Sequence, residues 1–275
     1  RAVPYQQYVL RKSYSLASIL KEQGYSTSAF HCYYPQGYNR NITYPRLGFE
    51  SFSSMYELKN LSRIREYPDD LSTYKNIISL YENKKEGEKI FNFTLTMQNH
   101  GSYTYDGEDF VTTVTAMDGN YPKLDQYLSL IKIADESLKY LIDYFSNQEE
   151  HTIIAMFGDH QPYVEDEFYN EMLSQNYEDI SSKEAVERKY ITPFMIWANY
   201  DIDTEKYKDL SDLSVNYLTS LVLDVANLQK TPYLEFLDEL REEIPIITGN
   251  GYMDKTGIYH DFSEETDYTN LIENY

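Results

Sequence analysis

The sequence has little cysteine, little basic charge and no long apolar run. Cys32 is the only cysteine in the 275 residues, so an intrachain disulfide is excluded. That scarcity is typical of a cytoplasmic protein, and equally of an exported protein from an organism that uses few disulfides. No apolar segment reaches the roughly 20 residues that a membrane-spanning helix needs.

The charge is strongly one-sided. Lys and Arg together number 24 against 45 Asp and Glu, and the formal net charge is −21. A nucleic-acid-binding domain needs a basic footprint, so nucleic acid is excluded as a partner. The acidity is accounted for by a well-solvated surface. A substrate that carries phosphate would therefore need local positive charge from a metal ion, a few His or an Arg.

Tyrosine is in excess, with 30 residues. These side chains either form sugar-stacking or lipid-facing surfaces or reflect a composition bias of the source genome. The chain begins at Arg1 without methionine or signal peptide, so we expect a piece or a mature product of a longer protein. Its length suits one large domain or two small ones, and a hydrophobic fraction of 41% suffices for a core.

Strand and helix signals alternate along the chain. Apolar spacing and turn residues predict helices over 14–23, 69–83, 123–145, 213–228 and 233–243, and strands over 25–30, 90–97, 153–157 and 194–197. Residues 33–50, rich in Tyr, Pro, Asn and Gly, predict a long loop. The apolar run 153–157 is typical of a strand buried on both faces of a parallel sheet.

This alternation predicts an α/β fold with a doubly wound, mostly parallel sheet and helices on both of its faces. The chain shows no inter-domain linker, so residues 1–275 are interpreted as a single domain. Asn250-Gly251 and the turn 254–257 predict a hairpin. Together with the helix before it, this hairpin predicts a small C-terminal α+β part at about 229–275.

Polar side chains follow three of the predicted strands. The first strand ends on His31, the second is followed by His100, and the third is followed by Asp159 and His160. In open α/β sheets the functional sites form outside the carboxyl ends of the strands, so we expect these side chains to converge on one edge. A carboxylate and an imidazole suit Mn²⁺, Zn²⁺ or Mg²⁺.

Each of these candidates also has a structural alternative. Asp159 could cap the next helix while His160 is partly buried, and His100 could be a structural histidine at a strand end. His31 and Arg40 could clamp a phosphate, since an Arg fork binds its oxygens in two-pronged fashion. Alternatively, they are a capping His and a surface Arg. Cys32 is interpreted as a small buried hydrophobe, because its neighbours offer no activation of a nucleophile.

Three segments resemble a known family, the lipoteichoic acid synthases and their sulfatase-like relatives of the alkaline phosphatase superfamily. The segment 95–103, Leu-Thr-Met-Gln-Asn-His-Gly-Ser-Tyr, is similar to the family's strand followed by Asn-His. The segment 153–160, Ile-Ile-Ala-Met-Phe-Gly-Asp-His, is similar to its metal-binding Gly-Asp-His. The segment 25–31 with Asn39-Arg40 and 47–49 is similar to its substrate loop. The resemblance covers about residues 14 to 228.

The resemblance implies an alkaline phosphatase-like fold and a role for each candidate residue. Asp159 and His160 would be metal ligands. His31, Tyr38, Arg40 and His100 would bind the substrate, and His100 would also act in catalysis by assisting proton transfer. The implied cofactor is one divalent metal, Mn²⁺ first, with Zn²⁺, Mg²⁺ or Ca²⁺ as alternatives.

The implied function is metal-dependent transfer of phosphoglycerol or another phosphoryl group, or sulfatase-like ester hydrolysis. The substrate would be a lipid-linked or envelope phosphate or sulfate ester. The parent protein would be a multi-pass protein of a bacterial membrane, with this domain on the extracytoplasmic face. The alternatives are a degenerate, non-catalytic module that binds a glycan or lipid head group, and an unrelated cytoplasmic α/β protein.

Two departures from the family pattern bear on these expectations. The family's other metal ligand and its Thr nucleophile lie upstream of the first matching segment. We therefore expect this stretch of chain to be inactive alone or to hold metal weakly. Tyr33 and Tyr38 also stand where the family often has an acidic residue and a Trp, so the acceptor or head group is expected to differ from glycerol phosphate.

Overall fold

The computed structural model describes residues 3–116, 120–173, 188–208, 210 and 212–275. The chain divides into two compact units, and each is described by itself. Unit 1 comprises Arg1–Asn147 and Pro162–Tyr169, and unit 2 comprises Gln148–Gln161 and Asn170–Tyr275.

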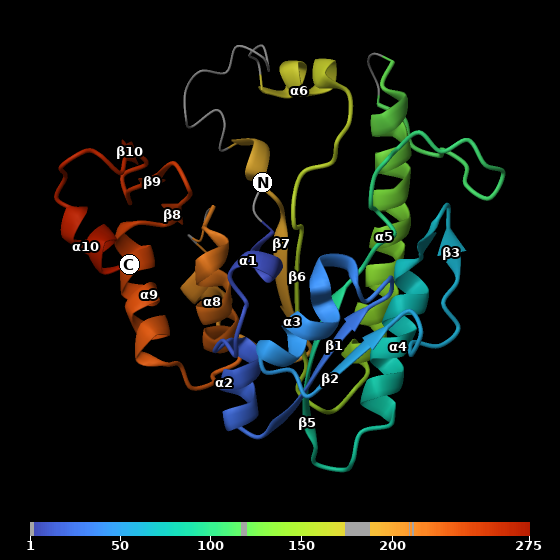
Figure 1. Cartoon of the computed structure of the whole chain (residues 1–275), viewed down its shortest axis with the longest axis horizontal. Coiled ribbons are helices and arrows are strands. Elements are labelled where there is room, and N and C mark those ends of the chain that lie inside the picture. The colour runs from blue at the N-terminus through green and yellow to red at the C-terminus, as the bar shows by residue number, and fades with distance from the viewer. Residues whose placement is uncertain (1–2, 117–119, 174–187, 209, 211) are drawn as a thin grey trace. The chain divides into compact units, whose positions relative to one another are not determined.

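A three-stranded parallel sheet forms the centre of unit 1. Its strands are β1 (Tyr25–His31), β2 (Ser51–Ser54) and β5 (Lys89–Leu95), in the order β2-β1-β5 (Figure 1). The register aligns His31 with Ser54 on one side and with Leu95 on the other. The carboxyl ends of all three strands therefore lie at one edge of the sheet.

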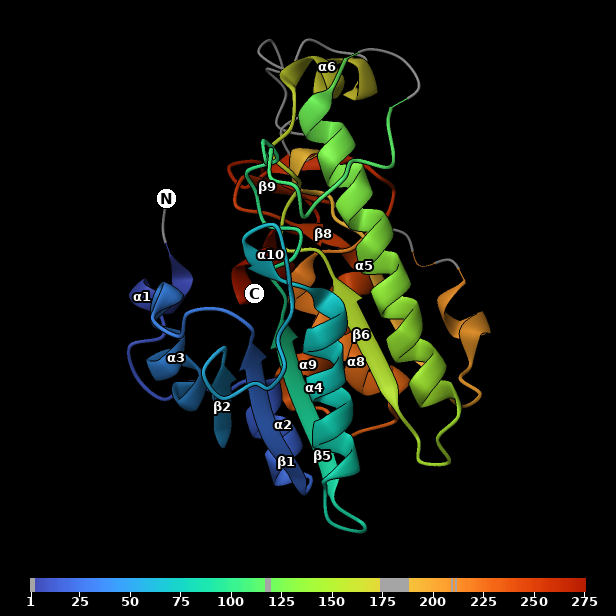
Figure 2. The same cartoon turned by 90° about the vertical axis from the view of Figure 1, so that its right-hand side faces the viewer.

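Helices lie on both faces of this sheet, as the predicted fold requires (Figures 1 and 2). α2 (Leu16–Glu22) packs on β1, while α4 (Asp70–Glu82) and α5 (Pro122–Ser146) pack side by side on the other face. Ser15 begins α2 with a capping box, and the Asp69 side chain begins α4 by accepting from the Ser72 main-chain N–H. The helices predicted over 14–23, 69–83 and 123–145 are thus confirmed.

The long loop predicted over 33–50 contains helical structure, so that prediction was wrong in part. The segment forms η1 (Gly37–Asn39) and α3 (Arg40–Arg46), with Pro45 inside the helix. Tertiary packing outweighs the turn-rich composition, because the Tyr44 ring is fully buried and contacts three phenylalanine rings. These rings are Phe49, Phe52 and Phe93.

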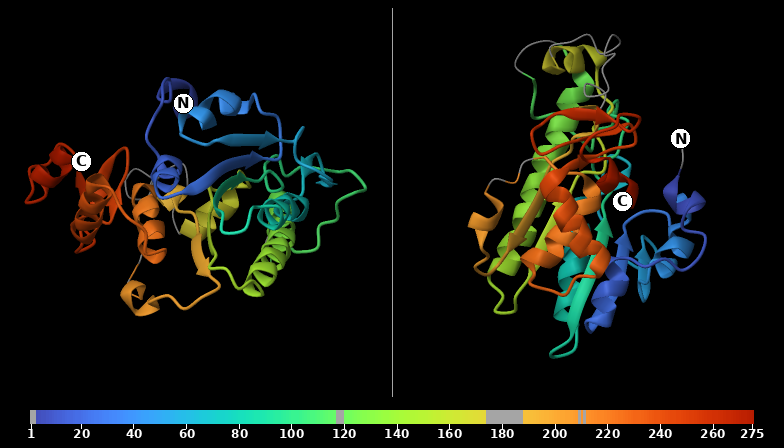
Figure 3. Two further views of the ribbon diagram at one scale, coloured as in Figure 1. Left: turned by 90° about the horizontal axis from the view of Figure 1, so that it is seen from below. Right: turned by 90° about the vertical axis from the view of Figure 1, so that its left-hand side faces the viewer.

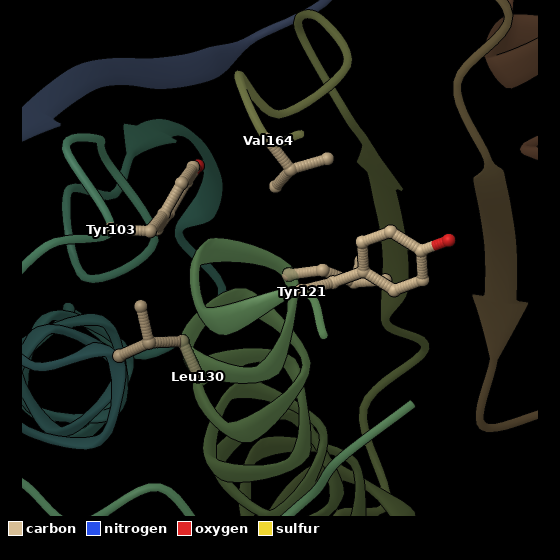
Figure 4. Packing of buried hydrophobic residues seen from close by; sticks show 5 residues of the cluster. Tyr103, Tyr121, Leu130 and Val164 are labelled. Carbon is tan, nitrogen blue, oxygen red and sulfur yellow. The ribbon is translucent and has the colours of Figure 1, made fainter. Parts of the chain in front are cut away.

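One apolar cluster joins α5 to the loop that follows β5. Leu130 projects from α5 toward α4, and Tyr103 lies above it in the loop (Figure 4). Tyr103, Tyr121, Leu124, Leu130 and Val164 are all buried, and Leu130 is 0% exposed. This cluster fixes the loop that carries His100 against the helical layer.

Unit 2 contains the strands predicted over 153–157 and 194–197, and the expectation that they lie in a parallel sheet was wrong. β6 (Ile153–Phe157) and β7 (Phe194–Ala198) pair antiparallel over their whole length. Met156 and Phe157 are 38% and 42% exposed, so the apolar run is not buried on both faces as predicted. Beyond Phe157 one more bond extends this pairing, in which the Gly158 N–H donates to the Pro193 carbonyl at 3.0 Å.

The C-terminal part of unit 2 combines helices with a small antiparallel sheet. α8 (Leu218–Val225) and α9 (Pro232–Glu243) pack side by side (Figure 3). The sheet has the order β10-β9-β8, and the hairpin expected near residues 250–257 is its β9-β10 pair. The bounds of its strands are β8 (Ile246–Ile247), β9 (Gly251–Met253) and β10 (Tyr259–Asp261).

The remaining elements are short. They are α1 (Pro4–Gln7), β3 (Arg63–Ile64), β4 (Tyr67–Pro68), α6 (Asp166–Leu173), η2 (Arg188–Tyr190), η3 (Thr204–Tyr207), η4 (Val215–Tyr217) and α10 (Thr269–Asn274). Within the described ranges, no helix combines the length and the hydropathy that crossing a membrane requires.

Replacing Leu130 by Ala should destabilise unit 1 strongly. The side chain is fully buried, so its truncation leaves a cavity and should lower the free energy of unfolding by about 2–5 kcal/mol. The matched control is Leu10→Ala, at a side chain that is 64% exposed, which should change stability by less than about 0.5 kcal/mol. Urea unfolding followed by circular dichroism measures both. Equal losses in the two variants would contradict this account of the core.

Candidate active site

His31 ends β1 and lies fully inside unit 1, with 1% of its surface exposed. Its Nδ1 is 3.3 Å from the Leu95 carbonyl oxygen. A carbonyl only accepts hydrogen bonds, so Nδ1 carries the proton and Nε2 of the neutral ring keeps its lone pair. His31 is thus a buried side chain with one free acceptor nitrogen, not a cap at the surface.

Burial, and after it the charge of Arg40, lowers the pKa of His31 from 6.5 to about 4, against the opposing effect of the Leu95 hydrogen bond. The imidazole is therefore neutral at pH 7. In this state Nε2 accepts a hydrogen bond and does not donate one. It suits a hydroxyl group of a ligand better than an oxygen of a phosphate.

Arg40 begins α3 and is also buried, with 7% of its surface exposed. One guanidinium nitrogen donates to the Gly37 carbonyl at 3.0 Å, and the Nε atom has no partner. The Tyr38 ring covers the guanidinium at 4.9 Å from its centroid. Within the described part of the chain no carboxylate pairs with Arg40, so its charge is available to an anionic ligand.

The turn before Arg40 needs unusual backbone angles. Tyr38 and Asn39 both have a positive φ, at 54° and 57°. A Cβ atom on Gly37 would lie 2.9 Å from the Arg40 guanidinium, so a larger residue there would displace the guanidinium from its present position. Tyr38 itself is 52% exposed and forms the outer surface over Arg40.

His100 lies in the loop after β5 and is exposed. Its Nδ1 donates to the Gly101 carbonyl at 2.7 Å, which leaves Nε2 as the free acceptor, as in His31. The Tyr67 hydroxyl donates to the same carbonyl at 3.0 Å, and the two rings are 5.1 Å apart. His31 and His100 therefore adopt the same tautomer at the same edge of the sheet.

Sequence reasoning missed the residue that holds the His100 loop in place. Arg65 is buried and donates to three main-chain carbonyls, those of Gln98, His100 and Ser102, each at 2.8 Å. Its φ of 58° is left-handed, and no helix, strand or motif signal marks the position. Arg65 is a positioning residue, because it contacts the loop and not the free nitrogen of His100.

Gln98 and Asp70 complete the support of this loop. The Gln98 side chain, 0% exposed, accepts from the Asp70 main-chain N–H and donates to the Leu130 carbonyl, and so joins α4 to α5. Burial raises the pKa of Asp70 to about 7, although a hydrogen bond with Thr96 opposes the shift. Asp70 is therefore only partly ionised near pH 7.

Cys32, next to His31, has the structural role that the sequence indicated. It is fully buried and packs with Phe30 and Leu58. Burial raises the pKa of its thiol to about 11, so it is not a nucleophile at neutral pH.

Asp159 and His160 follow β6 in unit 2, and both are exposed. The His160 Nε2 is 3.6 Å from an Asp159 carboxylate oxygen, and its Nδ1 donates to the Gln161 carbonyl. The helix α6 begins only at Asp166, so Asp159 does not cap it, and His160 is not partly buried. The two side chains offer one oxygen and one nitrogen donor in a form open to a metal ion.

The donor atoms of Asp159 and His160 are of the types that bind a divalent metal ion, but these two side chains are only two ligands. Within the residues that the structure describes, no group of three or more His, Cys, Asp or Glu side chains is placed to hold a metal ion. The structure brings His31, Arg40, Tyr38 and His100 to one edge of unit 1. Their convergence with Asp159 and His160 stays a prediction.

Comparison with known proteins decides the family. The model of the sulfatase family matches residues 2–228, which is most of the chain. The chain belongs to the sulfatase family. The resemblance given by the three segments is thereby confirmed, and so is the kind of protein expected, an enzyme domain.

This sulfatase-family chain is similar to three curated relatives at 24–28% identity. A "Putative cyclic beta-1,2-glucan modification protein" of Rhizobium meliloti is 26% identical over 90% of the chain and 38% of the relative. A capsular polysaccharide biosynthesis protein of the same organism is 28% identical over 52% and 25%. A lipoteichoic acid synthase of Staphylococcus saprophyticus is 24% identical over 53% and 23%. The chain thus spans well under half the length of these relatives.

Solved structures confirm the fold class. The phosphoglycerol transferase GacH of Streptococcus pyogenes, in complex with sn-glycerol-1-phosphate, has a TM-score of 0.68 at 20% identity, over 92% of this chain and 59% of its own. An alkaline phosphatase superfamily protein of Vibrio parahaemolyticus has a TM-score of 0.62 at 17% identity, over 98% and 68%. The lipoteichoic acid synthase LtaP of Listeria monocytogenes has a TM-score of 0.55 at 20% identity, over 70% and 48%.

The buried, neutral His31 predicts a stability that depends on pH. Between pH 6.5 and 4 the unfolded chain binds a proton at residue 31 that the folded chain does not. The free energy of unfolding should therefore fall as the pH is lowered through this window. Urea unfolding at pH 7.5 and 4.5 should show wild type losing about 2 kcal/mol more than His31→Gln.

All other titrating groups are common to both proteins and cancel in this difference. NMR supplies the independent check, with the His31 ring signals assigned by their absence from the His31→Gln spectrum. These signals should not titrate between pH 7.5 and 5.5. Equal stability losses in both proteins, or a His31 ring that titrates near pH 6.5, would show that its environment is not as described.

Proposed function

We propose that this chain is the catalytic portion of a metal-dependent transferase or hydrolase that acts on phosphate or sulfate esters of lipid or envelope-polymer head groups, phosphoglycerol transfer being the leading case. The observation that carries the proposal is the buried guanidinium of Arg40, which has a free Nε donor and no carboxylate partner among the residues that the structure describes. Such a group favours an anion with several oxygens, as a phosphate or sulfate has.

The imidazoles of His31 and His100 would contact the remaining groups of the substrate. Nε2 of His31 would accept a hydrogen bond from a hydroxyl of the head group while Arg40 binds the non-bridging oxygens. Nε2 of His100, at the exposed end of the site, would take the proton of the attacking hydroxyl or return it to the leaving oxygen. Tyr38 would close the site from outside, because its ring covers Arg40.

Asp159 and His160 would hold the metal ion. Such an ion, bound by oxygen and nitrogen donors, stabilises charge on the ester oxygens during transfer. Mn²⁺ is the proposed ion, and Zn²⁺, Mg²⁺ and Ca²⁺ are the alternatives, because the donor types do not distinguish them. Two ligands hold a metal ion only weakly, so this stretch of chain by itself is proposed to be inactive or nearly so.

The names of the relatives support a proposal for the substrate and the location. Their names refer to a glucan, a capsular polysaccharide and lipoteichoic acid, and the structural neighbour GacH binds sn-glycerol-1-phosphate. All of the polymers named are envelope saccharides or envelope polymers. We therefore propose that the parent protein is membrane-anchored in a bacterium and that this domain works on the extracytoplasmic face.

Replacing Arg40 by Lys should weaken the binding of sn-glycerol-1-phosphate at least about tenfold, because an ammonium cannot supply the planar fork of donors. Calorimetric titration of the full chain measures the affinity. Arg46→Lys is the matched control, since Arg46 lies in the same helix but donates to the Val9 carbonyl at 2.8 Å. Equal affinities for wild type and Arg40→Lys would remove Arg40 from the anion site.

Titration of Mn²⁺ into the same protein should show weak binding that Asp159→Ala/His160→Ala abolishes, because these side chains are the donors in question. His151→Ala is the control, since that ring is stacked on Tyr200 at 4.2 Å and is not proposed as a ligand. Binding that survives in the double variant would place the metal elsewhere, and the metal assignment would then be abandoned.

A further inference from the structure

A row of tyrosine rings leads away from His100 across the surface of unit 1. Tyr67 lies 5.1 Å from the His100 ring, and Tyr33 lies 5.6 Å from Tyr67. Tyr34 then contacts Tyr33 at 4.6 Å, and Tyr56 contacts Tyr34 at 6.4 Å. These four residues, Tyr67, Tyr33, Tyr34 and Tyr56, are called the tyrosine track below.

The track follows the functional edge of the sheet. Tyr56 comes after β2, Tyr33 and Tyr34 come after β1, and His100 comes after β5. The order along the track therefore matches the strand order β2-β1-β5 (Figure 1). A hydrogen bond of 3.3 Å from the Met55 N–H to the Tyr33 carbonyl joins the first two loops. Ligands of open α/β sheets bind at this edge.

The track presents both ring surface and hydroxyl groups to solvent. Tyr34 and Tyr56 are 47% and 60% exposed, and Tyr33 and Tyr67 are half-buried. Tyr33 and Tyr34 pack edge to face at an interplanar angle of 70°, so the rings hold each other in place. The hydroxyls of Tyr33, Tyr34 and Tyr56 form no hydrogen bond with the part of the chain that is described. Exposed, pre-positioned aromatic rings of this kind mark a binding surface.

The charge around the track indicates which kind of ligand it takes. The carboxylate of Glu57, beside Tyr56, accepts from both the N–H and the hydroxyl of Ser54, at 2.7 and 2.6 Å. The guanidinium of Arg65, over the Tyr67 ring, is committed to three carbonyls. The four side chains of the track are themselves uncharged and aromatic, which favours a neutral ligand over an anionic polymer or a lipid chain.

We propose that the tyrosine track binds a neutral glycan chain. A pyranose ring has an apolar face of C–H groups that stacks on a phenol ring, and its rim of hydroxyls can pair with the free tyrosine hydroxyls. The end of the track at His100 places one end of the glycan next to the proposed proton-transfer group. The role of this glycan as the acceptor rests on the proposed function, whereas its binding does not.

The test measures binding of two neutral probes, a linear β-glucan hexasaccharide and maltohexaose, to the full chain by saturation-transfer NMR and calorimetry. Tyr34→Ala/Tyr56→Ala should weaken binding of the better probe at least about tenfold, since two stacking rings are removed. Tyr34→Phe/Tyr56→Phe should lose less affinity for the glycan, because the rings are kept. Tyr140→Ala, at a ring that is 44% exposed on α5, should bind as wild type does.

Because both replaced rings are exposed, the double variants should keep the unfolding midpoint of wild type, and this is measured alongside. Absence of binding by both probes, or equal weakening by Tyr140→Ala, overturns the proposal. Binding of phosphatidylglycerol vesicles that the double Ala variant loses, without any sugar binding, assigns the track to lipid and also overturns it. Arg40→Lys should leave glycan binding intact, so failure of the anion site and failure of the track are separate results.

Discussion

The parallel pairing of β1 with β5 is the constraint on which the unit 1 site depends. Its register places His31 opposite Leu95, and the hydrogen bond between these two residues fixes the His31 tautomer. The same pairing brings the loop after β5 to the edge where the loop after β1 begins. The positions of His31 and of the loop that carries His100 are thus set by a backbone ladder, while the turn at Gly37–Asn39 places Arg40.

The electrostatics of the site are local and differ from those of the whole chain. The net charge is −21, yet the guanidiniums of Arg40 and Arg65 are buried, and neither has a carboxylate partner in the described ranges of the chain. Main-chain carbonyls and tyrosine rings surround them instead. Asp70, the nearest buried acid to the loop, has a pKa raised to about 7. An anionic ligand would therefore meet the charge of Arg40, whose Nε is unpaired, whereas the Arg65 guanidinium is held by the loop carbonyls.

Much of this architecture could be predicted from the sequence, because periodicity and strand-end residues carry direct signals. The helices α2, α4 and α5, the strands β1 and β5, and the positions of His31, His100, Asp159 and His160 at strand ends follow from such signals. The helix α3 could not be predicted, since the burial of Tyr44 among aromatic rings is a tertiary effect that outweighs Pro45. The antiparallel β6-β7 pair could not be predicted either, because an apolar run does not encode strand direction.

Arg65 escaped prediction for a different reason, and that reason has an evolutionary consequence. Its three bonds to the 98–102 loop all end on main-chain carbonyls, which every residue type possesses. The anchor therefore places no demand on the side chains at Asn99 or Ser102. Related proteins can exchange those side chains, and with them the chemistry next to His100, while the loop keeps its path. An attachment of this kind allows the shape of a loop to stay the same while the side chains that set its specificity change.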